Sequence, residues 1–173
     1  MVRLIMSGKG EGKTKQLLEL MNSAADTEAG CMVCIEPTRN MSFNLRHQTR
    51  LVDASEFSIN SFESLRGFIC GLYAGNYDIS HIFIDNLCNV AHSNDDRQIG
   101  DFLSWLDTFS SPLGLKATIT ISADPDTATD TMRKCMSAVL PRSPIRRPDL
   151  SGRRIFSSLT GPVEWVILNE EER

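Results

Sequence analysis

Residues 3–14 read RLIMSGKGEGKT, a short apolar run followed by a glycine-rich loop that ends in Gly12-Lys13-Thr14. The residues that follow, up to Ala25, have apolar side chains at helical spacing. Strand, glycine loop and helix in this order predict a phosphate-binding loop, because the loop N–H groups and the positive end of the helix dipole both attract an anion. The residues expected to contact a nucleoside triphosphate are Ser7, Gly8, Lys9, Gly10, Glu11, Gly12, Lys13, Thr14 and Lys15.

Two side chains of this loop would have separate tasks. Lys13 would reach the β and γ phosphates, and the Thr14 hydroxyl would be a ligand of Mg²⁺. One position departs from the motif G-x-x-x-x-G-K-[ST], since Ser7 stands where the first glycine is usual. The alternative interpretation is a Gly/Lys-rich turn that happens to precede a helix.

Downstream, apolar strand patterns alternate with amphipathic helix patterns. Strands are expected at residues 3–6, 31–35, 79–84 and 117–123, with a short one at 51–54. Helices are expected at 14–25, after Asn60 and Glu63 as a capping box, after Asn94–Asp96, and after Asp124-Pro125. This alternation predicts an α/β fold, with a mostly parallel sheet and helices on both faces.

Two acidic residues end predicted strands and are candidate site residues. Asp85 closes the apolar run HIFID and would hold Mg²⁺ through water beside Thr14. Asn86 follows it, where many NTPases have a water-activating Glu. Glu36 ends the second strand and could instead orient and deprotonate the attacking water. The open alternatives are an ordinary strand-end Asp85 and a solvated Glu36 before a proline turn.

Ser122 and a cysteine pair complete the candidates. Ser122 closes the strand at 117–123 and could sense the γ phosphate, although Ser is also an ordinary strand-end residue. Cys31 and Cys34 form a lone C-x-x-C without a second ligand pair. We expect both to be small buried thiols that bind no metal.

Composition limits the domain organisation and the cellular location. The chain has 173 residues, 41% apolar residues and a net charge of −4, which suit one soluble domain. No run approaches a membrane span, and Gly8, Lys9 and Glu11 interrupt the apolar start, so a cytoplasmic protein is expected. We expect a nucleotide-binding domain over 1–140, an irregular Pro/Arg-rich connection over 141–162, and a terminal strand with an acidic tail over 163–173, packed on the same domain.

Five short segments together resemble a known family. They are Gly10–Lys15 (GEGKTK), Leu51–Phe57 (LVDASEF), Gly67–Leu72 (GFICGL), Ile82–Asp85 (IFID) and Thr120–Pro125 (TISADP). They are similar to small, uncharacterised bacterial P-loop proteins with a RecA-like core, sometimes labelled pilus-retraction (twitching-motility) ATPases. The resemblance covers roughly residues 1–138 and implies ATP binding on a three-layer P-loop NTPase fold of RecA-like type, with Glu36 and Asp85-Asn86 in matching places. It does not imply motility.

Several functions follow from these patterns. The first is a slow Mg²⁺-dependent ATPase that acts with an unknown partner, either another protein or further copies of itself. The second is a non-catalytic nucleotide sensor. The third is a small-molecule kinase resembling thymidine kinase, against which Asp85-Asn86 and the lone C-x-x-C argue. Nucleic-acid handling rests only on Arg142, Arg146, Arg147, Arg153 and Arg154, which are also candidates, with Arg39, Arg46 and Arg50, for an arginine that contacts the γ phosphate.

Overall fold

A five-stranded sheet is the centre of the part of the chain that the structure describes. The computed structural model describes residues 1–38 and 49–137. Within them the strands lie in the order β1-β5-β4-β2-β3, and every pairing is parallel. The strands are β1 (Val2–Ser7), β2 (Cys31–Glu36), β3 (Thr49–Asp53), β4 (Ile79–Ile84) and β5 (Lys116–Ser122). Because all pairings are parallel, the carboxyl ends of the five strands lie along one edge of the sheet.

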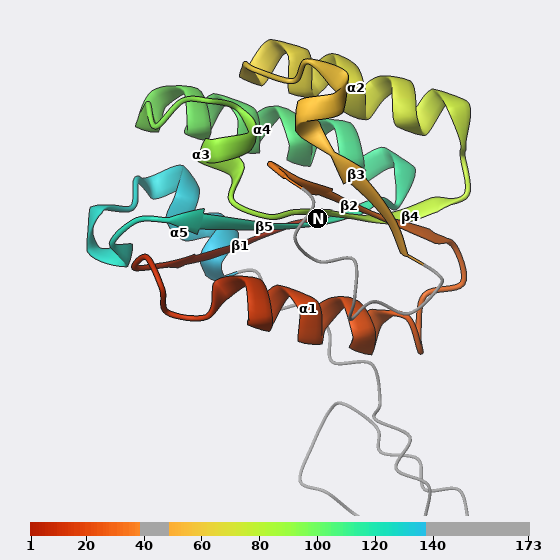
Figure 1. Ribbon diagram of the computed structural model, residues 1–173, viewed down its shortest axis with the longest axis horizontal. Helices are drawn as coiled ribbons and strands as arrows, with labels where there is room; N and C mark the ends of the chain where they lie inside the picture. The colour runs from red at the N-terminus through yellow and green to blue at the C-terminus, as the bar shows by residue number, and fades with distance from the viewer. Residues whose placement is uncertain (39–48, 138–173) are drawn as a thin grey trace, which may run out of the picture. The chain divides into compact units, whose positions relative to one another are not determined.

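Helices cover both faces of the sheet, which gives three layers (Figure 1). Helix α1 (Lys13–Ala24) lies on one face, and α2 (Phe62–Gly75), α3 (Leu87–Val90) and α4 (Asp96–Ser110) lie on the other. Helix α5 (Asp130–Ser137) packs against β1 and α4. Short 3-10 turns occupy Ala54–Phe57, Ser111–Leu113 and Pro125–Thr127. The predicted α/β architecture, with helices on both faces of a parallel sheet, is therefore confirmed.

The order of the strands separates the first strand from the strand that ends in Asp85. β1 pairs with β5, from Val2 opposite Ala117 to Ser7 opposite Ser122, and β5 then pairs with β4. Among the described residues β1 has no other strand neighbour. The last strand of this sheet in sequence is thus the neighbour of the first.

The core has a part on each face of the sheet, which explains the continuous apolar strands. Leu17 and Met21 of α1 pack with Met32, Cys34 and Phe83 on one face. The opposite face packs aliphatic strand residues against α2, α4 and α5, among them Val33, Ile35, Ile82, Ile84, Ile119, Leu65, Ile69, Phe102, Leu103 and Met132. A strand that is covered on both faces has no solvent-exposed side, so its apolar residues do not alternate with polar ones.

Two helix starts differ from expectation. The α2 cap is Ser61, whose side chain accepts from Ser64 N–H while the Ser64 hydroxyl reaches back to Ser61 N–H, so the Asn60–Glu63 capping box was wrong. Asp124 caps a 3-10 turn, and α5 begins only at Asp130. The Asp95 carboxylate caps α4 as expected, by accepting from Gln98 N–H.

The C-x-x-C pair also differs from expectation. Cys34 is buried beneath α1, but Cys31 at the start of β2 is exposed, so the expectation of two buried thiols was half wrong. A strand start lies at the rim of the sheet, where the covering layers end.

Some predicted features lie outside the described residues: Arg39, Arg46, the connection 141–162 with its five arginines, and the terminal strand with its acidic tail predicted over 163–173. In the described ranges, no helix is both long enough and apolar enough to cross a bilayer.

Candidate functional site

The glycine loop joins β1 to α1 at the carboxyl edge of the sheet. Gly10 and Gly12 have φ values of +86° and +80°, a left-handed conformation that residues with a Cβ rarely adopt. Gly12 is the N-cap of α1, and no side chain caps this helix start. The N–H groups of the first turn are therefore left for an external acceptor, as a phosphate-binding loop requires.

Lys13 is buried although it carries a charge. Its side chain is 7% exposed, and Nζ donates to the carbonyl oxygens of Ser7 at 2.9 Å and Gly8 at 2.6 Å. The carbonyls of the loop thus hold the ammonium at the loop itself rather than in solvent. A positive charge fixed beside free helix N–H groups favours an anion.

Thr14 and Asp85 lie together, as the sequence predicts. Thr14 Oγ1 is 3.1 Å from Asp85 Oδ2 and 3.4 Å from Oδ1, although α1 and β4 are far apart in the chain. A second hydroxyl fixes the same carboxylate, since Thr120 Oγ1 donates to Asp85 Oδ1 at 2.8 Å. Thr120 Oγ1 also accepts from Asn86 N–H at 2.7 Å. Asp85 is therefore oriented by a hydroxyl on each side.

Glu36 stands beside Asp85 at the same edge. β2 and β4 pair as far as Ile35 and Ile84, and Asp85 N–H continues the ladder by donating to Ile35 O at 2.9 Å. Glu36 is 1% exposed, so the alternative of a solvated glutamate is wrong. Thr120, Asp85 and Glu36 consequently form a polar row across β5, β4 and β2, which we call the carboxylate row.

The negative charge of the carboxylate row affects the thiol of Cys34. It lies two residues before Glu36 on the same strand, beneath α1. Burial raises the pKa of its thiol well above the usual value, and the carboxylates of Glu36 and Asp85 raise it further. The described part of the chain buries these two carboxylates and a single Lys or Arg, Lys13. A buried carboxylate attracts a cation more strongly than a solvent-screened one does.

The donor set suits magnesium. A threonine hydroxyl and a carboxylate are hard oxygen ligands of the kind that Mg²⁺ prefers. No group of three or more His, Cys, Asp or Glu side chains gathers around one point in the described ranges. Mg²⁺ at a nucleotide needs only one or two protein ligands, because water and phosphate oxygens supply the others.

The remaining predicted residues lie at different distances from the carboxylate row. Lys9, Glu11 and Lys15 are exposed around the loop. Ser122 is exposed and pairs with Ser7 in the sheet register, two residues after Thr120 of the carboxylate row. Arg50 pairs with Val33, three residues before Glu36, so β3 holds it away from the carboxyl edge.

Thr120 is the residue that sequence reasoning missed. It shares a face of β5 with Thr118 and Ser122, and it is 0% exposed. The alternation of Thr118, Ile119, Thr120 and Ile121 was a usable signal, because every second residue of a strand points to the same face. The sequence instead favours Ser122, the last polar residue of the strand.

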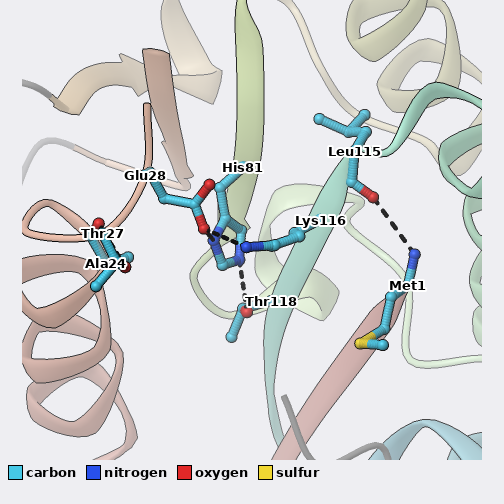
Figure 2. A network of polar contacts seen from close by, with 8 residues as sticks. All are labelled: Met1, Ala24, Thr27, Glu28, His81, Leu115, Lys116 and Thr118. Atoms are coloured by element: carbon cyan, nitrogen blue, oxygen red, sulfur yellow. Dashed lines mark hydrogen bonds and ion pairs between the residues drawn. The ribbon is translucent and has the colours of Figure 1, made fainter. Parts of the chain in front are cut away.

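A second polar cluster lies under the far end of α1 (Figure 2). Glu28 Oε1 accepts from Lys116 Nζ at 2.7 Å and lies 3.7 Å from His81 Nδ1, while His81 Nε2 is 2.9 Å from Thr118 Oγ1. The contact with His81 and the Lys116 ammonium lower the pKa of Glu28 to about 2, against the opposing effect of burial. Burial lowers the pKa of His81, and the Glu28 carboxylate only partly offsets this. The cluster ties the turn after α1 to β4 and β5.

The comparison with solved structures supports the fold. No family model matches the chain, and no curated protein matches it. A KaiC-like protein from the hyperthermophilic archaeon Pyrococcus horikoshii OT3 is similar in structure, with 15% sequence identity and a TM-score of 0.56. The similarity covers 78% of this chain and 69% of that one. With the parallel five-stranded sheet, it shows the α/β P-loop NTPase fold of RecA-like type that was predicted, while the resemblance to a bacterial family stays a prediction.

Proposed function

We propose that the protein binds ATP and Mg²⁺ at the loop Ser7–Thr14 and hydrolyses the nucleotide slowly, in concert with a protein partner or further copies of itself. The observation that carries this proposal is the contact of Thr14 with Asp85, next to the buried Lys13. Loop, ammonium, hydroxyl and carboxylate meet at one edge of a P-loop fold. A plain glycine turn before a helix would need none of these contacts.

Each residue has a distinct task in this proposal. The N–H groups of the loop and Lys13 would bind the phosphates, with Lys13 exchanging the carbonyls of Ser7 and Gly8 for phosphate oxygens. Thr14 and Asp85 would hold Mg²⁺, and the metal would neutralise charge on the phosphates. Thr120 would keep Asp85 in place, and Ser122 would lie near the γ phosphate.

Glu36 would act as the general base. It stands beside Asp85 in the carboxylate row and is almost fully buried. A carboxylate shielded from bulk water can hold a water molecule for in-line attack and accept its proton. Its position after the first crossover, rather than directly after Asp85, makes it the candidate base of this chain.

A nucleotide sensor without turnover is the second candidate. Asn86 occupies the position after Asp85 with φ +52° and ψ +63°. Asn tolerates this left-handed conformation better than Glu, so the backbone here suits a residue that cannot act as a base. In the sensor, ATP binding alone would change the surface seen by a partner.

Two measurements on the purified protein test the proposal. Titration calorimetry with MgATP should give binding that Lys13→Ala weakens by about ten- to a hundredfold, because a charge-assisted contact to phosphate is lost. Lys134→Ala, which removes an exposed lysine of α5 outside the loop, is the matched control. Unchanged affinity in Lys13→Ala would remove the phosphate-loop assignment. Phosphate release, measured with and without DNA or RNA, separates the ATPase from the sensor.

A further inference from the structure

The side chain of Glu11 folds back onto the phosphate loop. Glu11 Oε2 accepts a hydrogen bond from Gly8 N–H at 2.9 Å, and Glu11 N–H faces Gly8 O at 3.4 Å. A Cβ built on Gly8 would come within 2.7 Å of Glu11 Oε1, so the carboxylate lies directly against this glycine. Residues 8–11 therefore form a turn closed by both a backbone and a side-chain contact.

This carboxylate occupies a donor that the loop would otherwise offer to a ligand. Gly8 N–H is a backbone donor of the glycine loop, and a carboxylate oxygen is an anionic acceptor like a phosphate oxygen. Gly8 O is also engaged, because it accepts from Lys13 Nζ at 2.6 Å. An incoming phosphate must displace Glu11 to reach the Gly8 donor.

The charge of Glu11 acts on the ligand even after displacement. The side chain is exposed, and after displacement its carboxylate stays attached to the loop that would bind the phosphate. Like charges at such distances repel, and the repulsion grows with the charge of the ligand. A nucleotide complexed with Mg²⁺ carries less negative charge than the free nucleotide and is repelled less.

We propose that Glu11 is a specificity-determining residue of the loop: its carboxylate stands in for a phosphate at Gly8 N–H and makes the site select nucleotides complexed with Mg²⁺ over free nucleotides. The inference rests on the proposed function, because it concerns the same loop. It adds a role that the loop motif does not specify, since the motif leaves this position open.

Two substitutions separate the contributions of charge and hydrogen bonding. Glu11→Gln keeps an acceptor for Gly8 N–H but removes the charge, whereas Glu11→Ala removes both. Glu19→Gln makes the same charge change at an exposed position on α1 and is the matched control. The dissociation constant of ATP is measured by calorimetry for all four proteins, once with Mg²⁺ and once with excess EDTA.

We expect Glu11→Gln to bind free ATP about three- to tenfold more tightly than the wild type, with a smaller gain for MgATP. Glu11→Ala should gain at least as much, and Glu19→Gln should differ by less than about twofold. If wild-type binding of MgATP is normal and Glu11→Gln behaves like Glu19→Gln, the inference is overturned and the proposed function stands. Weaker binding by Glu11→Gln also overturns it, because Glu11 would then be a ligand. A wild type that binds no MgATP contradicts the proposed function itself.

A measurement without nucleotide tests the stand-in contact separately. Hydrogen exchange of the Gly8 amide, followed by NMR in the ligand-free protein, should be faster in Glu11→Ala than in the wild type, because the acceptor is lost. Glu11→Gln and Glu19→Gln should keep most of the protection. Equal exchange in wild type and Glu11→Ala would show that Glu11 does not hold Gly8 N–H.

Discussion

Thr14 Oγ1 lies 3.1 Å from Asp85 Oδ2 across 71 residues of sequence. The start of α1 therefore lies over the end of β4, although β5 separates β4 from the strand that leads into α1. This geometry makes one hydroxyl and one carboxylate available to the same ion. A substitution of Asp85 should therefore affect the binding of that ion in particular.

Asp85→Asn should weaken MgATP binding by about tenfold or more and reduce the dependence of binding on Mg²⁺, because a charge beside the metal is lost. Calorimetry at several Mg²⁺ concentrations measures both effects. Asp101→Asn on the exposed side of α4 is the control for net charge. Full Mg²⁺ dependence in Asp85→Asn would contradict the metal assignment.

Thr120→Val and Thr118→Val form a matched pair on one strand. Both threonines are 0% exposed and point to the same face, but Thr120 contacts Asp85 and Thr118 contacts His81. Each loss should cost about 1–3 kcal/mol of unfolding free energy, since a buried partner loses its hydrogen bond. Only Thr120→Val should also weaken MgATP binding, by roughly three- to tenfold. Equal affinities in the two variants would separate Thr120 from the site.

Glu36→Gln should leave nucleotide binding nearly intact and reduce turnover by about 10²–10⁴-fold, the usual contribution of a general base. Phosphate release at saturating MgATP is the readout, and calorimetry verifies binding. Wild-type turnover in the Gln variant would exclude Glu36 as the base. Absence of turnover in the wild type with every partner tried would favour the sensor.

The free energy of unfolding should decrease in two pH ranges as the solution is acidified. The pKa of His81 is lowered from 6.5, so below that pH the unfolded chain takes up a proton that the folded chain resists, and stability decreases. The pKa of Glu28 is lowered from 4.5 to about 2, so its contribution is complete above 4.5 and is lost towards pH 2. Each group changes the unfolding free energy by at most about 1.4 kcal/mol per pH unit.

Urea unfolding at a series of pH values measures these slopes. His81→Gln should flatten the profile between pH 7 and 5, and Glu28→Gln should flatten it below about pH 4.5. The exposed His92, with φ +52°, is the control as His92→Asn, because Asn tolerates this backbone. A profile for His81→Gln parallel to that of the wild type would contradict the lowered pKa.

Replacing either of two glycines in α2 by alanine should stabilise the protein. Gly67 and Gly71 are exposed within the helix, and a Cβ at either position meets no atom within 4 Å. Gly67→Ala and Gly71→Ala should each raise the unfolding free energy by about 0.5–1 kcal/mol. Gly30→Ala should destabilise instead, because its Cβ would clash with the Asp78 carbonyl oxygen. Urea unfolding decides the sign, and a loss in both α2 variants would indicate that their surface is in contact with another element.

The sequence predicted those features that depend on neighbouring residues. The phosphate loop and the four strands at 3–6, 31–35, 79–84 and 117–123 follow from local apolar runs and glycines. Asp85 follows from its place at a strand end. The sequence did not predict Thr120 as a site residue, because its contact with Asp85 depends on the strand order, which places β5 next to β4. Ser61 rather than Asn60 caps α2, because it is the Ser61 side chain that accepts from Ser64 N–H, and composition does not decide between two adjacent polar residues.

The pairing of β1 with β5 has a consequence for the order of assembly. β1 leaves the ribosome before the other four strands of the described sheet, yet its partner in that sheet ends at Ser122. The loop that follows β1 cannot be anchored until β5 has been synthesised, and contacts between such distant segments form slowly. A nascent chain that ends before β5 would carry the complete glycine loop and still lack Thr120 and the strand that supports it. Nucleotide binding would then mark the completion of the fold and, in the cell, would stabilise only chains that have reached it.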